Sequence, residues 1–167
     1  HGLLRRQRQM CIRDSIWGGD KPQKILPEVI AKPWVKLSKF LGRPPILSYA
    51  SYCLDNWFKI DNDKPISLNN VALINNFLGG VDEDWFVTIH VCIEDAARDA
   101  VDAAYKLSEL KETNKINDFS VQLKRIIKSL KAVNAIFSKM PEKCDPYVYY
   151  HRVRPYIFGT KDNPDLK

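Results

Sequence analysis

The segment Met140–Pro164 carries the residue types best suited to chemistry in this chain of 167 residues. Its central part, Tyr147–Arg154, holds three tyrosines, one histidine and two arginines. An aromatic ring offers a flat apolar wall to a ligand, and the planar fork of an arginine matches both oxygens of a carboxylate. This mixture suits a pocket for a flat molecule with an anionic end. On residue types alone, the alternative is a core helix whose arginines lie in solvent at its edge.

Histidine is the other candidate for chemistry. His90 lies among apolar residues at helical spacing, between Phe86 and Ile93. A single histidine in such a place is ordinarily a core residue that needs one or two hydrogen-bond partners. His151 is flanked by a tyrosine and an arginine and can face solvent. The sequence has no HExxH motif and no histidines at metal-ligand spacing, so residue types predict no metal site.

The composition indicates a globular protein with a substantial core, since 45% of the residues are hydrophobic and 28% are charged. No apolar run approaches the roughly 20 residues that span a bilayer, and the start shows no secretory pattern. The four cysteines are far apart in sequence, which disfavours a disulfide framework or a thiolate zinc site. We therefore expect a cytoplasmic protein without a membrane partner.

The net charge of +6 is unevenly distributed. Residues 1–15 hold four arginines and one aspartate, a net charge of +3, so the other residues also carry only +3. A basic arm can bind nucleic acid, but no helix-turn-helix or metal-finger pattern follows it, and we expect no nucleic-acid partner. We interpret residues 1–15, which include His1, as a non-native leader and exclude them from the fold.

Hydrophobic spacing predicts an all-α fold. The predicted helices are Glu28–Leu41, Ile46–Phe58, Trp85–Leu110, Asp118–Lys139 and a last helix from Asp145-Pro146 to about Phe158. No alternating strand pattern of useful length is present.

Single residues set the expected ends of these helices. Gly42 stops the first, Asn117 or Asp118 caps the fourth, and Asp145 caps the last, which Pro155 weakens or kinks. The acidic cluster Asp82–Asp84 is explained by its place at a helix start. The fourth helix is expected to pack through the stripe Phe119, Leu123, Ile126, Leu130, Val133 and Phe137.

Aromatic and cationic groups thus lie on three predicted helices. They are Tyr49 and Tyr52, Phe86 and His90, and Tyr149 and Arg154. If those helices pack side by side, these groups can line one cavity.

At these residues the chain resembles the indoleamine 2,3-dioxygenase family, haem enzymes that open the indole ring of tryptophan. The resemblance covers nearly everything after residue 25. Four segments carry it in the family's order: Lys32–Trp57, Phe77–Glu94, Met140–Tyr156 and Lys161–Pro164.

The resemblance implies the end of a small helical domain at residues 16–42 and the N-terminal portion of a haem-binding large domain at residues 43–167. It also implies that haem b, L-tryptophan or another indoleamine, and O2 meet in the complete protein, which is expected to be monomeric. The indole C2–C3 bond is cleaved to give N-formylkynurenine, a step of tryptophan catabolism in the kynurenine pathway. The family's proximal histidine has no counterpart here, so we expect a fragment that is inactive alone and contains no metal ligand.

Roles at the substrate are carried over one position at a time. The resemblance makes Arg154 the partner of the substrate carboxylate. It makes Tyr149 an aromatic residue over the substrate ring, and Tyr150 the neighbouring aromatic residue of the haem pocket.

The other wall of the implied pocket comes from earlier segments. Phe86 matches an aromatic residue of the distal pocket, Tyr49 a tyrosine of its wall, and Tyr52 lies one turn further on. His90 departs from the family pattern, which has a small hydroxyl residue there. We hypothesise that His90 hydrogen-bonds the indole N–H or the bound oxygen. The alternative function is a non-catalytic helical interaction module on the same scaffold.

Overall fold

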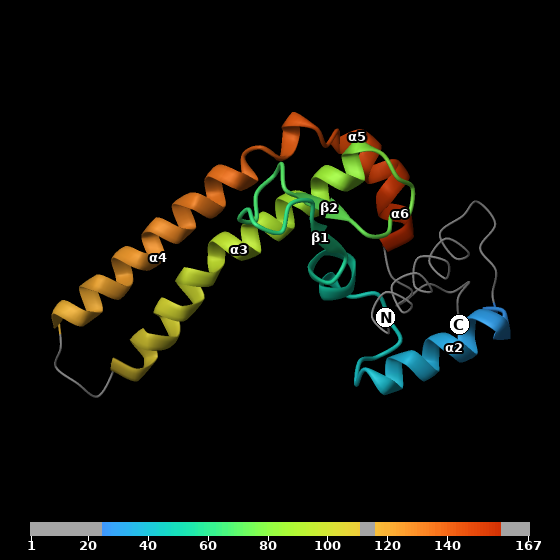
Figure 1. The fold of residues 1–167 in the computed structure, drawn as a ribbon, viewed down its shortest axis with the longest axis horizontal. Coiled ribbons are helices and arrows are strands. Elements are labelled where there is room, and N and C mark those ends of the chain that lie inside the picture. The colour runs from blue at the N-terminus through green and yellow to red at the C-terminus, as the bar shows by residue number, and fades with distance from the viewer. Residues whose placement is uncertain (1–24, 111–115, 158–167) are drawn as a thin grey trace.

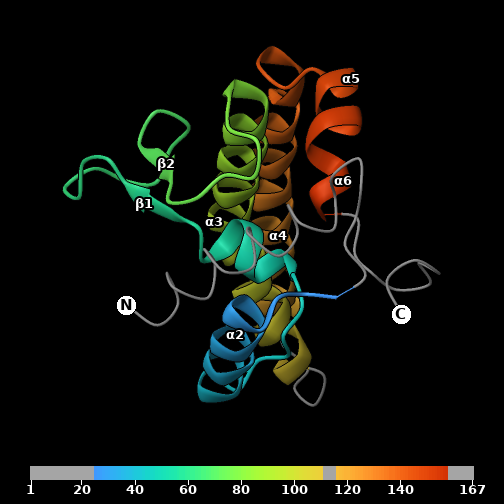
Figure 2. The ribbon, with the colours of Figure 1, turned by 90° about the vertical axis from the view of Figure 1, so that its right-hand side faces the viewer.

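The computed structural model describes residues 25–110 and 116–157. Two long antiparallel helices, α3 (Val81–Glu109) and α4 (Ile116–Phe137), dominate the molecule (Figure 1). The remaining elements gather around the first half of α3, and α2 (Glu28–Phe40) lies to one side (Figures 1 and 2). The predicted helical fold class is confirmed. The predicted non-native leader, residues 1–15, lies outside the described residues, and the division into two domains stays a prediction.

Side chains from both helices hold the α3–α4 hairpin together. The indole Nε1–H of Trp85 donates to the carbonyl of Lys139 at 2.9 Å, and the Ser129 hydroxyl donates to the carbonyl of Ala96. Arg125 of α4 forms ion pairs with two aspartates of α3. Such exposed ion pairs contribute little, about 0–1 kcal/mol each, so the buried contacts carry most of the stability.

The prediction of which α4 side chains are buried is wrong in part. Ile126 and Val133 are half-buried against α3, but Phe119, Leu130 and Phe137 are about half exposed (49%, 54% and 53%). The side of α4 that faces α3 also contains polar residues such as buried Ser129. A hydrophobic pattern marks the apolar surface of a helix but does not say which part of that surface a given neighbour covers. The expected cap at Asn117 or Asp118 is also wrong, because α4 already begins at Ile116.

Helix α2 ends as its sequence predicts. Gly42 adopts a positive φ of 63° just after the helix. Its N–H donates to Lys39, and the next N–H, of Arg43, donates to Ser38. This pair of bonds is the Schellman arrangement, in which glycine accepts the left-handed conformation at little cost.

The helix predicted for Ile46–Phe58 is largely replaced by other structure. A π-helical turn, η1 (Ala50–Leu54), is followed by strand β1 (Trp57–Lys59), which pairs antiparallel with β2 (Val71–Leu73). Buried Asn56 drives the change, because its side chain exchanges two hydrogen bonds with the backbone of Asn75, at 2.8 and 3.0 Å. Strands of three residues are too short to show an alternating pattern in sequence.

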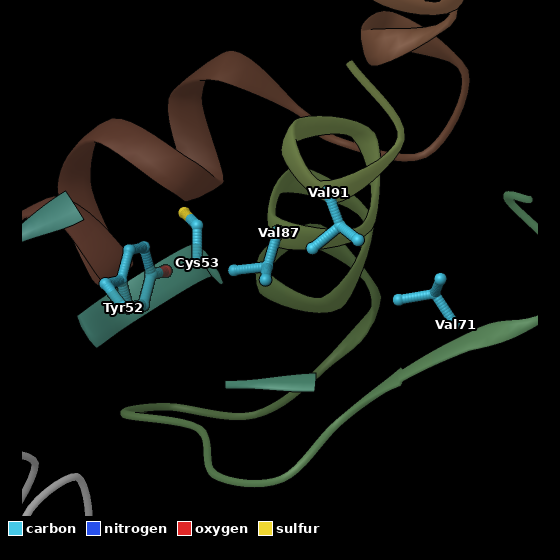
Figure 3. Packing of buried hydrophobic residues seen from close by; sticks show 5 residues of the cluster. All are labelled: Tyr52, Cys53, Val71, Val87 and Val91. Carbon is cyan, nitrogen blue, oxygen red and sulfur yellow. The ribbon is translucent and has the colours of Figure 1, made fainter. Parts of the chain in front are cut away.

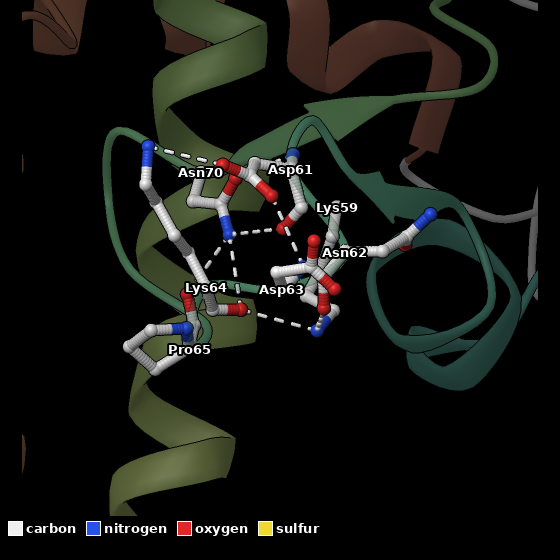
Figure 4. Close-up of polar contacts among 7 residues, drawn as sticks. All are labelled: Lys59, Asp61, Asn62, Asp63, Lys64, Pro65 and Asn70. Carbon is white, nitrogen blue, oxygen red and sulfur yellow. Dashed lines mark hydrogen bonds and ion pairs between the residues drawn. The ribbon is translucent and has the colours of Figure 1, made fainter.

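The loop between β1 and β2 is organised by one buried amide. The Asn70 side chain donates to three backbone carbonyls, and its oxygen accepts from the Asp61 N–H at 2.8 Å (Figure 4). The Lys59 ammonium donates to the carbonyl of Asn62 and also to that of Lys64, which Asn70 shares. These bonds satisfy backbone groups that would otherwise favour solvent, so the loop lies in one conformation against α3.

The hydrophobic core consists of two clusters on different faces of α3. The first joins η1 to β2 through α3 and contains Tyr52, Cys53, Val71, Val87 and Val91 (Figure 3). The second contains Trp85, Ile89 and Cys144 and lies toward the end of α4.

The acidic cluster at the start of α3 does more than favour the helix dipole. Glu83 is fully buried, and its carboxylate accepts backbone N–H bonds from Phe77, Leu78 and Gly79 at 2.8 to 3.0 Å. Asp82 accepts the backbone N–H of Asp145 at 2.8 Å. The cluster therefore ties both the preceding loop and the last helical segment to α3.

The last helical segment runs continuously through α5 (Pro146–Val148), η4 (Tyr149–Val153) and α6 (Arg154–Ile157). Asp145 caps it as predicted, accepting from two backbone N–H groups at 2.9 Å. Pro155 has no N–H for a helical bond. The π-helical turn η4, closed by a bond from the Arg154 N–H to the Tyr149 carbonyl, lies immediately before it. The weakening or kink predicted at Pro155 therefore appears as a π-helical turn just before the proline.

Within the described residues, no helix combines the length and apolar character needed to cross a membrane.

We expect Glu83→Gln to lower the free energy of unfolding by about 1–3 kcal/mol, because the amide keeps only one acceptor oxygen and its NH2 group then faces at least one of the three backbone N–H groups. Urea denaturation followed by circular dichroism measures this change. Glu109→Gln, at an exposed position near the end of α3, is the matched control and should leave the midpoint unchanged. Equal midpoints for both variants would contradict the role given to Glu83.

Candidate functional site

Two residues on one face of α3 form the base of the candidate site. Phe86 and His90 are one turn apart and both are half-buried. Their rings lie 4.2 Å apart between centroids. The neighbouring positions Val87 and Ile89 are fully buried in the two core clusters, so the backbone that carries the site is held firmly.

The two segments that pack on this face are both π-helical. In η1 the Asp55 N–H bonds to the Ala50 carbonyl, five residues earlier, and η4 repeats the pattern. Fewer than about 1% of residues in globular proteins are π-helical, and such turns occur frequently at functional sites. Because both π-helical turns contact Phe86, the geometry alone indicates that this region is a functional site.

Each π-helical turn brings a tyrosine to Phe86. The Tyr149 ring of η4 stacks on Phe86 with centroids 4.1 Å apart and planes at 23°. The Tyr52 ring of η1 lies 6.4 Å from Phe86 and is tilted by 34°. Tyr49, just before η1, meets His90 edge-on at 5.8 Å. The structure therefore brings together five of the predicted site residues.

The His90 ring has a defined orientation. Its Nδ1 lies 2.7 Å from the carbonyl oxygen of Phe86, which can only accept. The hydrogen must therefore be on Nδ1, and in the neutral imidazole Nε2 then offers a lone pair. His90 can accept a hydrogen bond from a ligand.

A pocket of about 230 Å³ opens among these side chains. Four predicted residues line it, namely Tyr49, Tyr52, Phe86 and His90. Sequence reasoning missed the other lining residues, which are Leu47, Ser48, Cys53 and Ile157. A flat apolar ring with a hydrogen-bond donor suits this lining.

The phenol oxygens of Tyr52 and Tyr149 are buried, and the two phenols are close enough to act on each other. Burial is the main cause that raises the pKa of both phenols, and the carboxylate of Glu83 adds to it. Both phenols therefore stay neutral.

Glu94 completes one edge of the site and was missed by sequence reasoning. It lies one turn beyond His90, and its carboxylate accepts the Tyr49 hydroxyl at 2.9 Å. Burial, then the contact with Glu94, raises the pKa of Tyr49. Glu94 follows His90 by four residues, and this spacing puts both side chains on the same helix face. That spacing was the sequence signal that could have identified Glu94 as a site residue.

Arg154 and Tyr150 lie apart from the pocket lining. Both are exposed, and the Arg154 guanidinium carbon sits 4.8 Å above the centre of the Tyr150 ring. This cation–π contact holds the arginine along the same helical segment that supplies Tyr149. The substrate role of Arg154 stays a prediction.

No group of three or more metal-ligating side chains is found in the described part of the chain.

We expect the Cys53 thiol to resist alkylation at pH 8, because burial raises its pKa to about 12 and its side chain is fully buried. Iodoacetamide labelling followed by peptide mass mapping measures the modification of this residue. The thiol should react rapidly once the chain is unfolded in urea, which serves as the control. Rapid labelling of Cys53 in the absence of urea would contradict the packing described here.

Comparison with known proteins adds an independent finding. A family model described as Indoleamine 2,3-dioxygenase matches residues 10–167. Indoleamine 2,3-dioxygenase 1 of Rattus norvegicus is 35% identical over 153 residues, which cover 90% of this chain and 38% of the rat protein. The protein of the same name from Mus musculus gives the same figures.

A relative from yeast gives a similar match. Indoleamine 2,3-dioxygenase of Saccharomyces cerevisiae is 29% identical over 151 residues, covering 86% of this chain and 33% of the yeast protein. The chain thus spans less than two fifths of the length of these curated relatives. The resemblance drawn from the residues is confirmed.

Proposed function

Because the chain belongs to the indoleamine 2,3-dioxygenase family, we propose that it forms the substrate-facing wall of a haem-dependent dioxygenase. The substrate is L-tryptophan or a related indoleamine, O2 is the co-substrate, and cleavage of the indole C2–C3 bond yields an N-formylkynurenine-type product. The observation that supports this most directly is the aromatic pocket around Phe86, with an imidazole acceptor on its wall.

The residues present fit the distal side of a haem. The pocket offers aromatic rings, hydroxyls and one imidazole, a set suited to an apolar group and a flat substrate and not to a closed metal cage. We assign contacts with haem b to Tyr52, Tyr150 and His90. When bound, the haem supplies the oxygen chemistry.

The chain's own residues orient the substrate. Phe86 and Tyr49 form the wall on which the indole ring rests, and Tyr149 stacks on Phe86 over the substrate. The His90 Nε2 accepts the indole N–H, while its Nδ1–H stays on the Phe86 carbonyl. A fixed acceptor of this kind positions the ring without reorganisation at the moment of reaction.

Arg154 holds the other end of the substrate. Its guanidinium fork can bind both carboxylate oxygens, and the Tyr150 ring beneath it restricts its rotamers. An ion pair at this exposed position is weak in water but strengthens once substrate and haem exclude solvent. The complete protein is proposed to be a cytoplasmic monomer without nucleic-acid or membrane partners.

We expect His90→Ala, in a full-length protein carrying this chain, to lower kcat/KM for tryptophan about tenfold through loss of the hydrogen bond to the indole N–H. Formation of N-formylkynurenine measures turnover. Tryptophan methylated on its indole nitrogen lacks this donor, so the same variant should show no further loss of kcat/KM for it. Equal losses for both substrates would contradict the hydrogen bond, and absence of all turnover in the unaltered protein would favour a helical interaction module.

We expect Arg154→Gln to lower kcat/KM for tryptophan by at least about tenfold while leaving tryptamine, which has no carboxylate, almost unaffected. Steady-state kinetics on both amines measures the difference. Arg152→Gln, at a neighbouring exposed arginine, is the matched control. A parallel loss on tryptophan and tryptamine would show that Arg154 acts on stability and not on the carboxylate.

A further inference from the structure

A second pocket lies on a different face of α3 from the candidate site. Its volume is about 530 Å³, larger than that of the pocket at Phe86 and within the range of small-molecule sites. Trp85 forms its floor with Leu68 and Ile136, which pack in the second core cluster. Its lining shares no residue with the pocket at Phe86.

The walls of the second pocket are fixed before any ligand arrives. The Trp85 indole is locked by its hydrogen bond to the Lys139 carbonyl. The opposite wall, residues 66–69, belongs to the loop that Asn70 holds with its side-chain hydrogen bonds (Figure 4). Pre-formed walls reduce the entropy lost on binding.

The rim of the second pocket favours one negative charge. Lys139 and Lys143 both line it, with Asp95 and Glu142. Asp95 is already paired with Arg98, so the two lysines outweigh Glu142. That remaining carboxylate disfavours a second negative charge on a ligand.

Lys143 and Trp85 form the recognition pair. The Lys143 ammonium lies 4.5 Å from the centre of the Trp85 ring. A ligand carboxylate can take this ammonium as a charge-assisted partner, while a ligand ring covers the apolar floor beside the indole. Both contacts require a flat ring and an anionic group in the same small molecule.

We propose that the second pocket binds a small aromatic monocarboxylate, with its ring on the Trp85–Leu68–Ile136 floor and its carboxylate between Lys139 and Lys143. The proposal rests on the described side chains of this pocket and is independent of the proposed dioxygenase activity.

Phenylacetate titrated into the ¹⁵N-labelled chain tests the proposal. The Trp85 indole N–H resonance, assigned with Trp85→Phe, should shift saturably. Replacing both lysines, as Lys139→Gln with Lys143→Gln, should weaken binding about tenfold or more. Lys131→Gln, at an exposed position of α4, is the matched control and should bind as the unaltered chain does.

Two comparisons decide the result. Phenylacetamide, which keeps the ring and loses the charge, should bind much more weakly than phenylacetate. Equilibrium dialysis with radiolabelled phenylacetate gives the same ranking without depending on spectral quality. The proposal is overturned if no saturable binding occurs, if phenylacetamide binds equally well, or if the double lysine variant keeps its affinity.

Discussion

The stacking of Tyr149 on Phe86 is the contact on which the candidate site depends. It joins the start of α3 to a segment about sixty residues later in the chain, and the two rings lie 4.1 Å apart. A hydrogen bond holds the same two segments together, because the Asp145 N–H donates to the Asp82 carboxylate at the start of α3. An aromatic pair contributes only about 0.5–1.5 kcal/mol beyond its buried area. Its importance lies in geometry, since it places η4 against the helix that carries His90.

The same region stores unfavourable energy that the rest of the fold must offset. Two phenol hydroxyls are buried, and two helical segments depart from α-helical bonding. Unfavourable features of this kind persist where surrounding structure holds them and cluster at functional sites. Here the holding structure is the buried first half of α3 and the Glu83 carboxylate, which fixes the loop entering it. The proposed function agrees with this distribution of order and strain.

Sequence reasoning predicted the long helices and the aromatic residues of the site because both depend on local signals. A 29-residue amphipathic helix and an aspartate–proline start are visible in the sequence itself. The π-helical turns were not predicted. Each contains one more residue than an α-helical turn, and a single inserted residue does not visibly change the spacing of hydrophobic residues. Strand β1 was mistaken for helix because Asn56 bonds to Asn75, a contact between positions that no local pattern links. Tertiary contacts of this kind also decided which side of α4 is buried.

The central claim is that α3 and η4 meet through Phe86 and Tyr149 to form one wall of a pocket. An NMR spectrum of the isotope-labelled chain that records through-space contacts between aromatic rings tests it most directly. The structure requires strong cross-peaks between the ring protons of Phe86 and Tyr149, and weaker ones between Phe86 and His90. A folded chain with intact α3 resonances and no contact between the rings of Phe86 and Tyr149 would contradict the account.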